Sequence, residues 1–319
     1  MALHSVKTAA ASAVPARRKS RHVGGFGPVA NMIWNIVVAL IALACVIPFI
    51  YTIIISLTDE QTIALKGYSF FPDKMSLSAY AYLFQDSGQL LNSYAVTIGV
   101  TLIGTILSLV LILPYGYALS RPEFEFRKQF TFFAFLTMLF NAGLVPFYMV
   151  VTQLLHIGDT LWALILPLSV NAFYIIVIRT FYKTTVSEGI VESARIDGAG
   201  DFRIFVKIVL PISLPGIATI GLFSALGYWN DWFNAMLFID NPRLVPLQYL
   251  LMRVQNNLQY LLENSQIIQS ADSTSMISAL PQEGIRMAMV VVATGPIVLA
   301  YPFFQRFFIQ GLTVGAIKG

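Results

Sequence analysis

Cysteine is almost absent from this 319-residue chain, which has only Cys45. No disulfide can therefore form within the chain, and no Cys and His residues have the spacing of metal ligands. The chain also lacks the G-x-x-x-x-G-K-[ST] phosphate loop, so we do not expect it to bind ATP for hydrolysis. No Ser/His/Asp set and no paired carboxylates occur in its apolar runs. The sequence therefore predicts a protein that is not an enzyme and holds no cofactor or metal of its own.

Charge is scarce as well. Charged residues make up 11% of the chain and hydrophobic residues 57%, with a mean hydropathy of +0.72. Such a balance cannot cover the surface of a soluble protein of this size, and it is typical of helical membrane proteins. The net charge of +4 comes from basic loops, so it does not indicate a nucleic-acid partner.

Long apolar runs with no or very few charges predict six transmembrane helices and an all-α fold. Each run has a stretch of about 18 residues or more, close to the ~20 that cross a bilayer as a helix. The predicted spans are Met32–Leu57, Tyr94–Leu119, Phe130–Leu155, Leu161–Tyr182, Ile212–Ile239 and Met287–Ile309. Prolines inside them predict kinks, at Pro48, Pro114, Pro146, Pro167, Pro296 and Pro302. Residues 32–309 would form this domain, between an N-terminal tail (1–31) without stable structure and a C-terminal tail (310–319).

Basic residues indicate the orientation. If the N-terminus is cytoplasmic, 15 of the 20 Lys and Arg residues fall on the cytoplasmic side. Both termini and the loop after the fourth span are then predicted to face the cytoplasm. Two longer outer segments follow from this topology: residues 58–93, with a short helix around Tyr80, and residues 240–286, where Leu247, Leu251 and Leu258 share one helical face. That face indicates either packing on the bundle or a platform for an external partner.

One polar segment between the fourth and fifth spans is patterned. Residues Glu192–Pro215, which we call the knob, contain a short helix beginning at Glu192, a Gly198-Ala199-Gly200 turn and a second helix capped by Asp201. Pro211 and Pro215 are expected to end that second helix. An ordinary connector between spans is the alternative to a docking surface.

The same residues resemble the EAA loop of permease subunits of binding-protein-dependent ABC importers. The match consists of Glu192, Ser193, Ala194, Asp197, Gly198, Ala199, Leu210, Pro211 and Pro215, within a loop of residues 183–215. Ser193 stands where that family usually has Ala. The resemblance implies that the knob docks into a separate ATPase subunit. It also implies a homologous second permease, two copies of the ATPase, an external solute-binding protein and a bacterial inner membrane.

Further segments resemble the sugar-importer branch of that family, the second permease of maltose-type systems in particular. They include Leu144-Val145-Pro146, Leu166 to Phe173, Tyr228 to Phe233 and Gly311 to Gly319, and the subgroup most similar is linked with complex or acidic oligosaccharides. The resemblance implies ATP-driven carbohydrate import. It also implies an ATPase contact by the tail, with Gly315, Lys318 and Gly319 as candidates.

Polar and aromatic residues in the apolar runs are candidates for a solute path. They are Asn141, Asn171, Tyr228, Trp229, Asn230, Asp231 and Trp232. Aromatic rings beside amide and carboxylate groups can stack on and hydrogen-bond a sugar, whereas an aromatic belt at the membrane interface explains the same pattern. An importer of peptides or amino acids and an ion-coupled carrier remain alternatives. The scarcity of charges at mid-membrane argues against the ion-coupled carrier.

Overall fold

A computed structural model describes residues 27–85, 87–263 and 281–315, and within these ranges it contains helices and no β-strand. The longest helices are α1 (Pro28–Ser56), α4 (Ser87–Ser120) and α16 (Gln282–Gly315). The other α-helices are α2 (Glu60–Lys66), α3 (Ser78–Leu83), α5 (Arg127–Leu139), α6 (Leu144–Met149), α7 (Leu161–Ile165), α8 (Ala172–Thr185), α9 (Glu188–Ile196), α10 (Asp201–Ile204), α11 (Leu210–Ile212), α12 (Leu214–Trp229), α13 (Phe233–Phe238) and α14 (Leu247–Glu263). Short π-helical turns at Val150–Leu154 and Phe205–Val209 and 3₁₀ turns at Leu166–Leu168 and Pro242–Leu244 complete the described elements.

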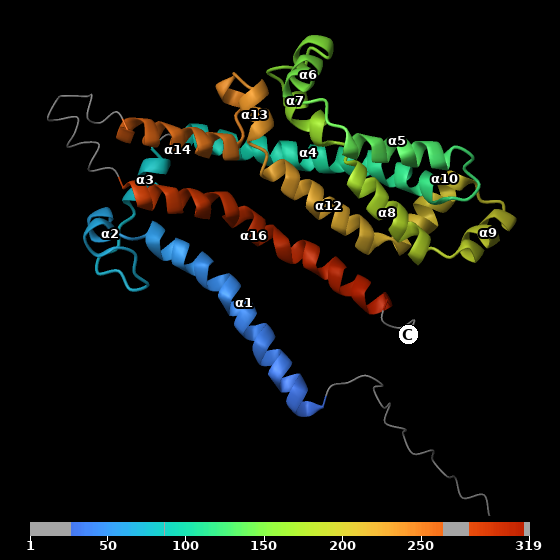
Figure 1. The fold of residues 1–319 in the computed structure, drawn as a ribbon, viewed down its shortest axis with the longest axis horizontal. Helices are drawn as coiled ribbons and strands as arrows, with labels where there is room; N and C mark the ends of the chain where they lie inside the picture. Colours follow the sequence, from blue (N-terminus) through green and yellow to red (C-terminus); the bar gives the residue numbers. More distant parts are fainter. Residues whose placement is uncertain (1–26, 86, 264–280, 316–319) are drawn as a thin grey trace, which may run out of the picture. The chain divides into compact units, whose positions relative to one another are not determined.

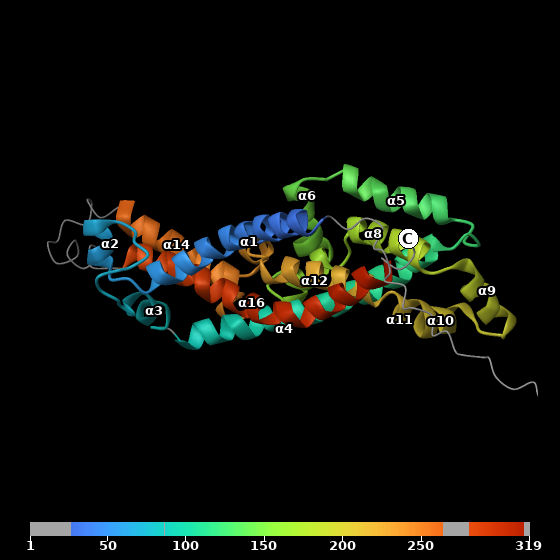
Figure 2. The ribbon, with the colours of Figure 1, turned by 90° about the horizontal axis from the view of Figure 1, so that it is seen from below.

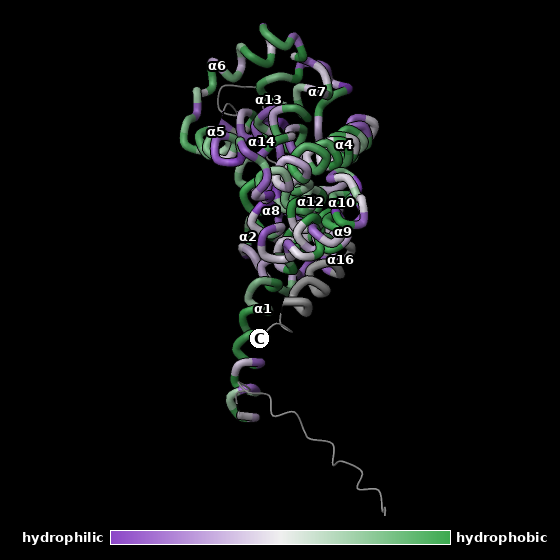
Figure 3. Tube along the Cα trace, turned by 90° about the vertical axis from the view of Figure 1, so that its right-hand side faces the viewer, coloured by the Kyte–Doolittle hydropathy of each residue, from purple (hydrophilic) through white to green (hydrophobic). Residues whose placement is uncertain are grey.

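The chain divides into two units, residues 1–50 and residues 51–319. The first unit contributes most of α1, a helix of 29 residues that continues through Pro48. Figure 3 shows that α1 is hydrophobic over most of its length, and α4 is also strongly apolar, with a mean hydropathy of 2.5 in its apolar stretch. Both helices are long enough to cross a membrane, as the sequence predicts.

Three of the predicted spans are not continuous helices. The described helices include three that can span a membrane singly and three bent pairs that can do so if each pair counts as one span. The pairs bend by 114° between Leu139 and Leu144, by 48° between Leu168 and Ala172, and by 82° at Ser213. The prediction of six single helices is therefore wrong for the third and fourth spans. The 82° bend lies at the start of the predicted fifth span, which is interrupted instead between Trp229 and Phe233, and the number of crossings stays a prediction.

Proline content does not by itself explain which spans break. Pro48, Pro114, Pro296 and Pro302 lie inside helices that continue past them. Pro146 and Pro167, in contrast, lie close to the breaks in the third and fourth spans. Helix boundaries also differ from the predicted ones, because α4 begins at Ser87 rather than Tyr94 and α16 begins at Gln282 rather than Met287.

The second unit is built around α4, which packs against α8 and α12, while α12 also packs against α16. Glycines permit the close approach of these helices. A Cβ atom on Gly104 would lie 2.4 Å from Cζ of Tyr228, and one on Gly116 would lie 2.3 Å from Cγ2 of Ile178. Side-chain packing between α4, α8 and α12 thus depends on residues that have no side chain.

Figures 1 and 2 place α9 and α10 at one end of this unit and α2, α3 and α14 at the opposite end. At the α9 end, a buried cluster joins the end of α4 to α8, α9 and α10, and it includes Tyr117, Tyr182, Val191 and Ile204. The first part of the knob is therefore continuous with the core of the bundle.

At the opposite end, the predicted apolar face of α14 is confirmed. Leu247, Leu251 and Leu258 are buried in a cluster with α3 and α16. Of the two interpretations of this face, packing on the bundle is therefore the correct one, because α3 and α16 of the same chain cover it. The short helix predicted around Tyr80 is also confirmed, as α3.

Candidate functional site

The helix α9 presents two different faces. It begins at Glu188, after Ser187, so the expectation that Glu192 starts this helix is wrong and Glu192 lies in its middle. Val191 and Ala194 are buried against the bundle, whereas Glu192 and Ser193 are exposed. Glu192 therefore lies on the exposed face of α9, away from the buried cluster.

The turn that follows α9 depends on the backbone of Gly198. Gly198 has φ +80°, a left-handed conformation that glycine adopts without steric cost. Its N–H donates to the carbonyl oxygen of Arg195 at 2.9 Å, and the N–H of Ala199 donates to that of Ala194 at 3.0 Å. No atom lies within 4 Å of the position of a Cβ on Gly198, so backbone conformation rather than crowding selects glycine here.

Asp201 does not cap the helix that follows. Gly200 is the residue before α10, and Asp201 is the first residue within it. Its carboxylate accepts a hydrogen bond from Arg195 instead, with 2.9 Å between Nη2 and Oδ1. Neither does Pro211 end the helical segment, which continues to Ile212 and breaks at Ser213, while Pro215 lies in the first turn of α12.

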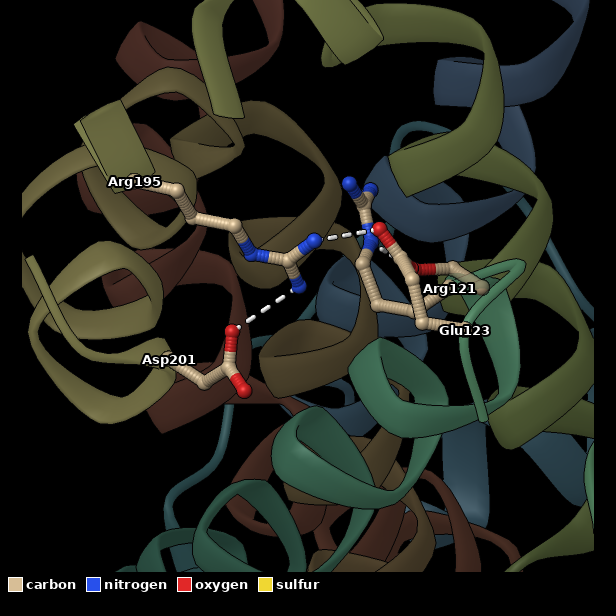
Figure 4. A network of polar contacts seen from close by, with 5 residues as sticks. Arg121, Glu123, Arg195 and Asp201 are labelled. Atoms are coloured by element: carbon tan, nitrogen blue, oxygen red, sulfur yellow. Dashed lines mark hydrogen bonds and ion pairs between the residues drawn. The ribbon is translucent and has the colours of Figure 1, made fainter. Parts of the chain in front are cut away.

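Arg195 also contacts the loop that follows α4 (Figure 4). Its Nη1 lies 2.5 Å from Oε1 of Glu123, so one guanidinium holds a carboxylate from that loop and another from the start of α10. The pKa of Glu123 is held below its ordinary value, first by its own backbone N–H and then by hydrogen bonding and charge from Arg195. The sequence alone does not indicate this network, because Glu123 and Arg195 lie 72 positions apart.

Arg121 stabilises the base of the same loop. It is buried, its guanidinium carbon lies 5.0 Å from the centroid of the Tyr117 ring, and its Nε donates to Oγ of Ser120 at 3.1 Å. Arg121, Arg195 and Phe202 line a cavity of about 440 Å³. Two arginines thus connect α4, its following loop and the knob at one point.

The outer side of the knob carries exposed apolar side chains that the sequence analysis did not single out. Ile196 is 85% exposed and Phe202 80% exposed, and Ile190 on α9 is also exposed. Exposed apolar groups beside the exposed carboxylate of Glu192 form a surface suited to protein contact. One signal in the sequence could have indicated this surface. Ile196 is an apolar residue between two charged ones, Arg195 and Asp197, and it does not lie on the buried face of α9.

The three asparagines predicted for the solute path all lie at helix ends. Oδ1 of Asn141 accepts a hydrogen bond from the N–H of Gly143 at 2.9 Å, and Oδ1 of Asn171 accepts one from that of Phe173 at 2.9 Å. Nδ2 of Asn230 donates to the carbonyl oxygen of Leu226 at 2.9 Å. These side chains are exposed, and each satisfies backbone groups where a helix begins or ends.

Tyr228 and Trp229 are held by packing. Both are buried; the Tyr228 hydroxyl donates to the carbonyl oxygen of Ile165 at 2.8 Å, and Nε1 of Trp229 donates to that of Ala293 at 3.0 Å. Their polar atoms are thus engaged within the chain in this conformation. The contact of Tyr228 joins α12 to α7, and the contact of Trp229 joins α12 to α16.

Asp231 and Trp232 lie in the short break between α12 and α13. Oδ2 of Asp231 accepts a hydrogen bond from Nδ2 of Asn234 at 2.8 Å, and Trp232 is 37% exposed, with its ring packed edge-on against Phe233. Phe233 and Asn141 line one open cavity of about 810 Å³. The structure therefore brings the α5–α6 break and the start of α13 together, but it does not gather all seven candidates.

The tail candidates are only partly described. Gly315 is the last residue of α16, whereas Lys318 and Gly319 lie outside the described residues. No group of three or more His, Cys, Asp and Glu residues in the described part of the chain is arranged to hold a metal ion.

Comparison with known proteins identifies the class. Residues 114–314 match the family described as "Binding-protein-dependent transport system inner membrane component". The chain belongs to this family and is a membrane permease subunit of such a transport system.

Two curated relatives from Bacillus subtilis (strain 168) match over most of both chains. The polygalacturonan/rhamnogalacturonan transport system permease protein YtcP is 38% identical over 88% of this chain and 95% of its own length. Protein LplC is 36% identical over 86% of this chain and 90% of its own length.

A solved structure is also similar over most of this chain. It covers 89% of this chain and 100% of its own, with a TM-score of 0.72 and 30% identity, and it belongs to a bacterial ABC transporter involved in the import of the acidic polysaccharide alginate.

Proposed function

We propose that this chain is the permease subunit of an ABC importer that translocates an oligosaccharide into the cytoplasm, driven by ATP hydrolysis in a separate subunit. The observation that carries this proposal is the similarity, over 88% of this chain, to YtcP, a permease named for polygalacturonan and rhamnogalacturonan transport. The similar solved structure belongs to a transporter of alginate, a second polymer of acidic sugars. An oligosaccharide, rather than a peptide or an amino acid, is therefore the favoured solute.

The proposed assembly contains a homologous second permease, two copies of the ATPase and an external solute-binding protein. In this assembly the exposed side of the knob, with Glu192, Ile196 and Phe202, docks on an ATPase subunit. Burial of Val191 and Ala194 in the bundle core and the bonds of Arg195 make the knob move as one body with α4 and α8. Closure of the ATPase dimer would then be transmitted to the helices that line the solute path.

The solute path is proposed to follow the breaks in the bent helices. Backbone groups at a break are free to bind solute or water only where they line a cavity, as in other transporters with discontinuous helices. Asn141 and Phe233 line such a cavity, and Trp232 is the residue directly before Phe233 in the chain. An aromatic ring next to amide and carboxylate groups suits the alternating apolar and hydroxyl faces of a sugar.

The C-terminal tail supplies a second proposed contact with the ATPase. Gly315, Lys318 and Gly319 are the residues concerned, by resemblance to maltose-type permeases. Deleting residues 314–319 should weaken the coupling of ATP hydrolysis to transport while leaving membrane insertion unchanged. Full transport by the truncated chain would remove this part of the proposal.

The test is uptake by vesicles that contain the complete transporter. Galacturonan oligosaccharides, neutral oligosaccharides and peptides are offered with the cognate binding protein, and uptake is measured with ATP and with an imposed ion gradient. We expect ATP-dependent uptake of an oligosaccharide and none driven by the gradient alone. Peptide uptake would overturn the solute class, and gradient-driven uptake without the ATPase would overturn the transporter class.

A Glu192→Ala variant tests the docking role in the same vesicles. Losing a partly buried charge-assisted contact costs about 1.5–3 kcal/mol, so we expect weaker ATPase binding and uptake reduced at least tenfold. Glu125→Ala, at an exposed position in the loop after α4 and outside α9, is the matched control and should retain uptake. Equal uptake by both variants would show that Glu192 is not part of the docking surface.

A further inference from the structure

A basic pocket lies between α5 and α8, separate from the Arg195 contacts and from the cavity at the α5–α6 break. It has a volume of about 600 Å³, and its lining includes Arg127, Lys128, Arg179 and Lys183 but no carboxylate. This accumulation of one sign of charge has no role in the function proposed above.

The four cations are not neutralised within the part of the chain that the structure describes, where none of them forms an ion pair. Arg179 is oriented by its Nε, which donates to the carbonyl oxygen of Leu119 at 3.2 Å. Like charges held in one pocket repel each other, so an anion bound among them is stabilised by several charge-assisted contacts.

The start of α5 adds to this preference. Arg127 is the first residue of α5, and Phe126 before it offers no side-chain oxygen to cap the helix. The N–H of Arg127 donates to the carbonyl oxygen of Phe124 at 3.1 Å, so the positive end of the helix dipole is what favours an anion near the side-chain charges.

The pocket changes from cationic to apolar along both helices. Arg127, Thr131 and Phe135 follow one another at intervals of four residues on α5, and all three line the pocket. On α8, Lys183, Arg179 and Ile176 make the corresponding series. Phe132 and Phe135, 64% and 45% exposed, form the apolar part. This gradient matches the charged head and apolar tail of an amphiphile rather than a free ion.

We propose that this pocket binds an anionic phospholipid, with the phosphate among the four cations and an acyl chain along Phe132 and Phe135. Membership of an inner-membrane permease family supplies the lipid surroundings, and the basic bias of this end places it at the anionic cytoplasmic leaflet. The proposal does not depend on which solute is carried.

The bound lipid would stabilise the position of the knob. The helix α8 ends at Thr185, and α9 begins at Glu188, so a headgroup that joins α8 to α5 holds the segment from which the knob extends. Anionic lipid is thus expected to stabilise the arrangement of α5, α8 and α9.

The test measures lipid binding to the full-length chain purified within its transporter, by native mass spectrometry. Phosphatidylglycerol is compared with phosphatidylcholine of the same acyl chains, and inorganic phosphate is a third arm. Each basic residue near an anionic headgroup strengthens binding about fivefold. Arg127→Gln/Lys183→Gln should therefore weaken phosphatidylglycerol binding about 30-fold. Lys66→Gln/Arg253→Gln has the same change in charge outside the pocket and should bind like the wild type.

Each outcome bears on the proposal. Selective phosphatidylglycerol binding that the pocket variant loses and the control retains supports it. Equal binding of the two lipids by the wild type overturns it, as does unchanged selectivity in the pocket variant. Inorganic phosphate that competes as effectively as phosphatidylglycerol identifies a free-anion site instead. If the double variant does not fold, Lys183→Gln alone, at an exposed position, should still show about a fivefold loss.

Discussion

Arg195 and Glu123 lie 72 positions apart in the sequence, and Nη1 of the arginine is 2.5 Å from Oε1 of the glutamate. The arginine belongs to α9 and the glutamate to the loop after α4, so the contact ties the knob to the end of the central helix of the bundle. The second bond of Arg195, to Asp201, closes the turn at Gly198. The knob is therefore bonded to the loop after α4 and also follows α8 directly in the chain.

A double-mutant cycle should reveal this link. Arg195→Ala, Glu123→Ala and the double variant are compared by thermal unfolding of the purified protein. Both side chains are partly exposed, so we expect a coupling energy of about 0.5–1 kcal/mol. Arg203→Ala with Glu123→Ala is the control pair and should show no coupling. A zero value for the Arg195 cycle would mean that the ion pair does not hold the knob.

Acid should weaken the same contact. The pKa of Glu123 in the folded protein lies below its ordinary value of 4.5, so the stabilisation is fully present above that value and is lost as pH falls through the folded pKa. We expect the wild type to lose more thermal stability than Glu123→Gln between about pH 6 and about pH 3. Parallel pH profiles of the two proteins would contradict the assignment.

Gly198 should resist substitution because of its backbone angle alone. Alanine at φ +80° costs about 1–2 kcal/mol, whereas Gly200 has φ −72° and no atom within 4 Å of a Cβ, so Gly200→Ala should be tolerated. We expect Gly198→Ala to lower the thermal midpoint and the ATPase coupling, with Gly198→Asn in between because asparagine adopts left-handed angles more readily. Equal behaviour of Gly198→Ala and Gly200→Ala would exclude a conformational requirement.

Gly104 tests the packing of α4 on α12. Its Cβ would overlap the ring of Tyr228, so Gly104→Ala should destabilise the protein by about 1–3 kcal/mol. Gly99 lies on the same helix with nothing within 4 Å of its Cβ, and Gly99→Ala should not destabilise. Gly104→Ala combined with Tyr228→Leu should recover part of the loss in thermal unfolding. No recovery would show that the overlap is not the cause.

Cysteine labelling tests the predicted orientation. In a Cys45→Ser background, a cysteine replacing Lys207 should be protected from an impermeant thiol reagent applied to intact cells, and one replacing Gln255 should react. Both side chains are exposed in the folded chain, so accessibility then reports the side of the membrane. Labelling at position 207 would reverse the orientation inferred from the basic residues.

The sequence by itself determined the helical membrane class, the residues of the knob and the family. Scarce charge and long apolar runs restrict the backbone to helices in lipid, and the glycine and proline positions of the knob depend on local backbone conformation. The apolar face of α14 was also predictable, because the helical spacing of its leucines is a property of the local sequence. All of these follow from properties of neighbouring residues in the chain.

Only the tertiary structure decided the bends of three spans, the burial of Tyr228 and Trp229, the partners of Arg195 and the basic pocket between α5 and α8. Arg127 and Lys183 lie on different helices. Glu123 precedes α8 in the chain, and Arg195 follows it. Which of these side chains meet depends on how closely α4, α5 and α8 pack and where each helix ends. Local periodicity carries no information on those distances, because they are set by contacts between segments far apart in the chain.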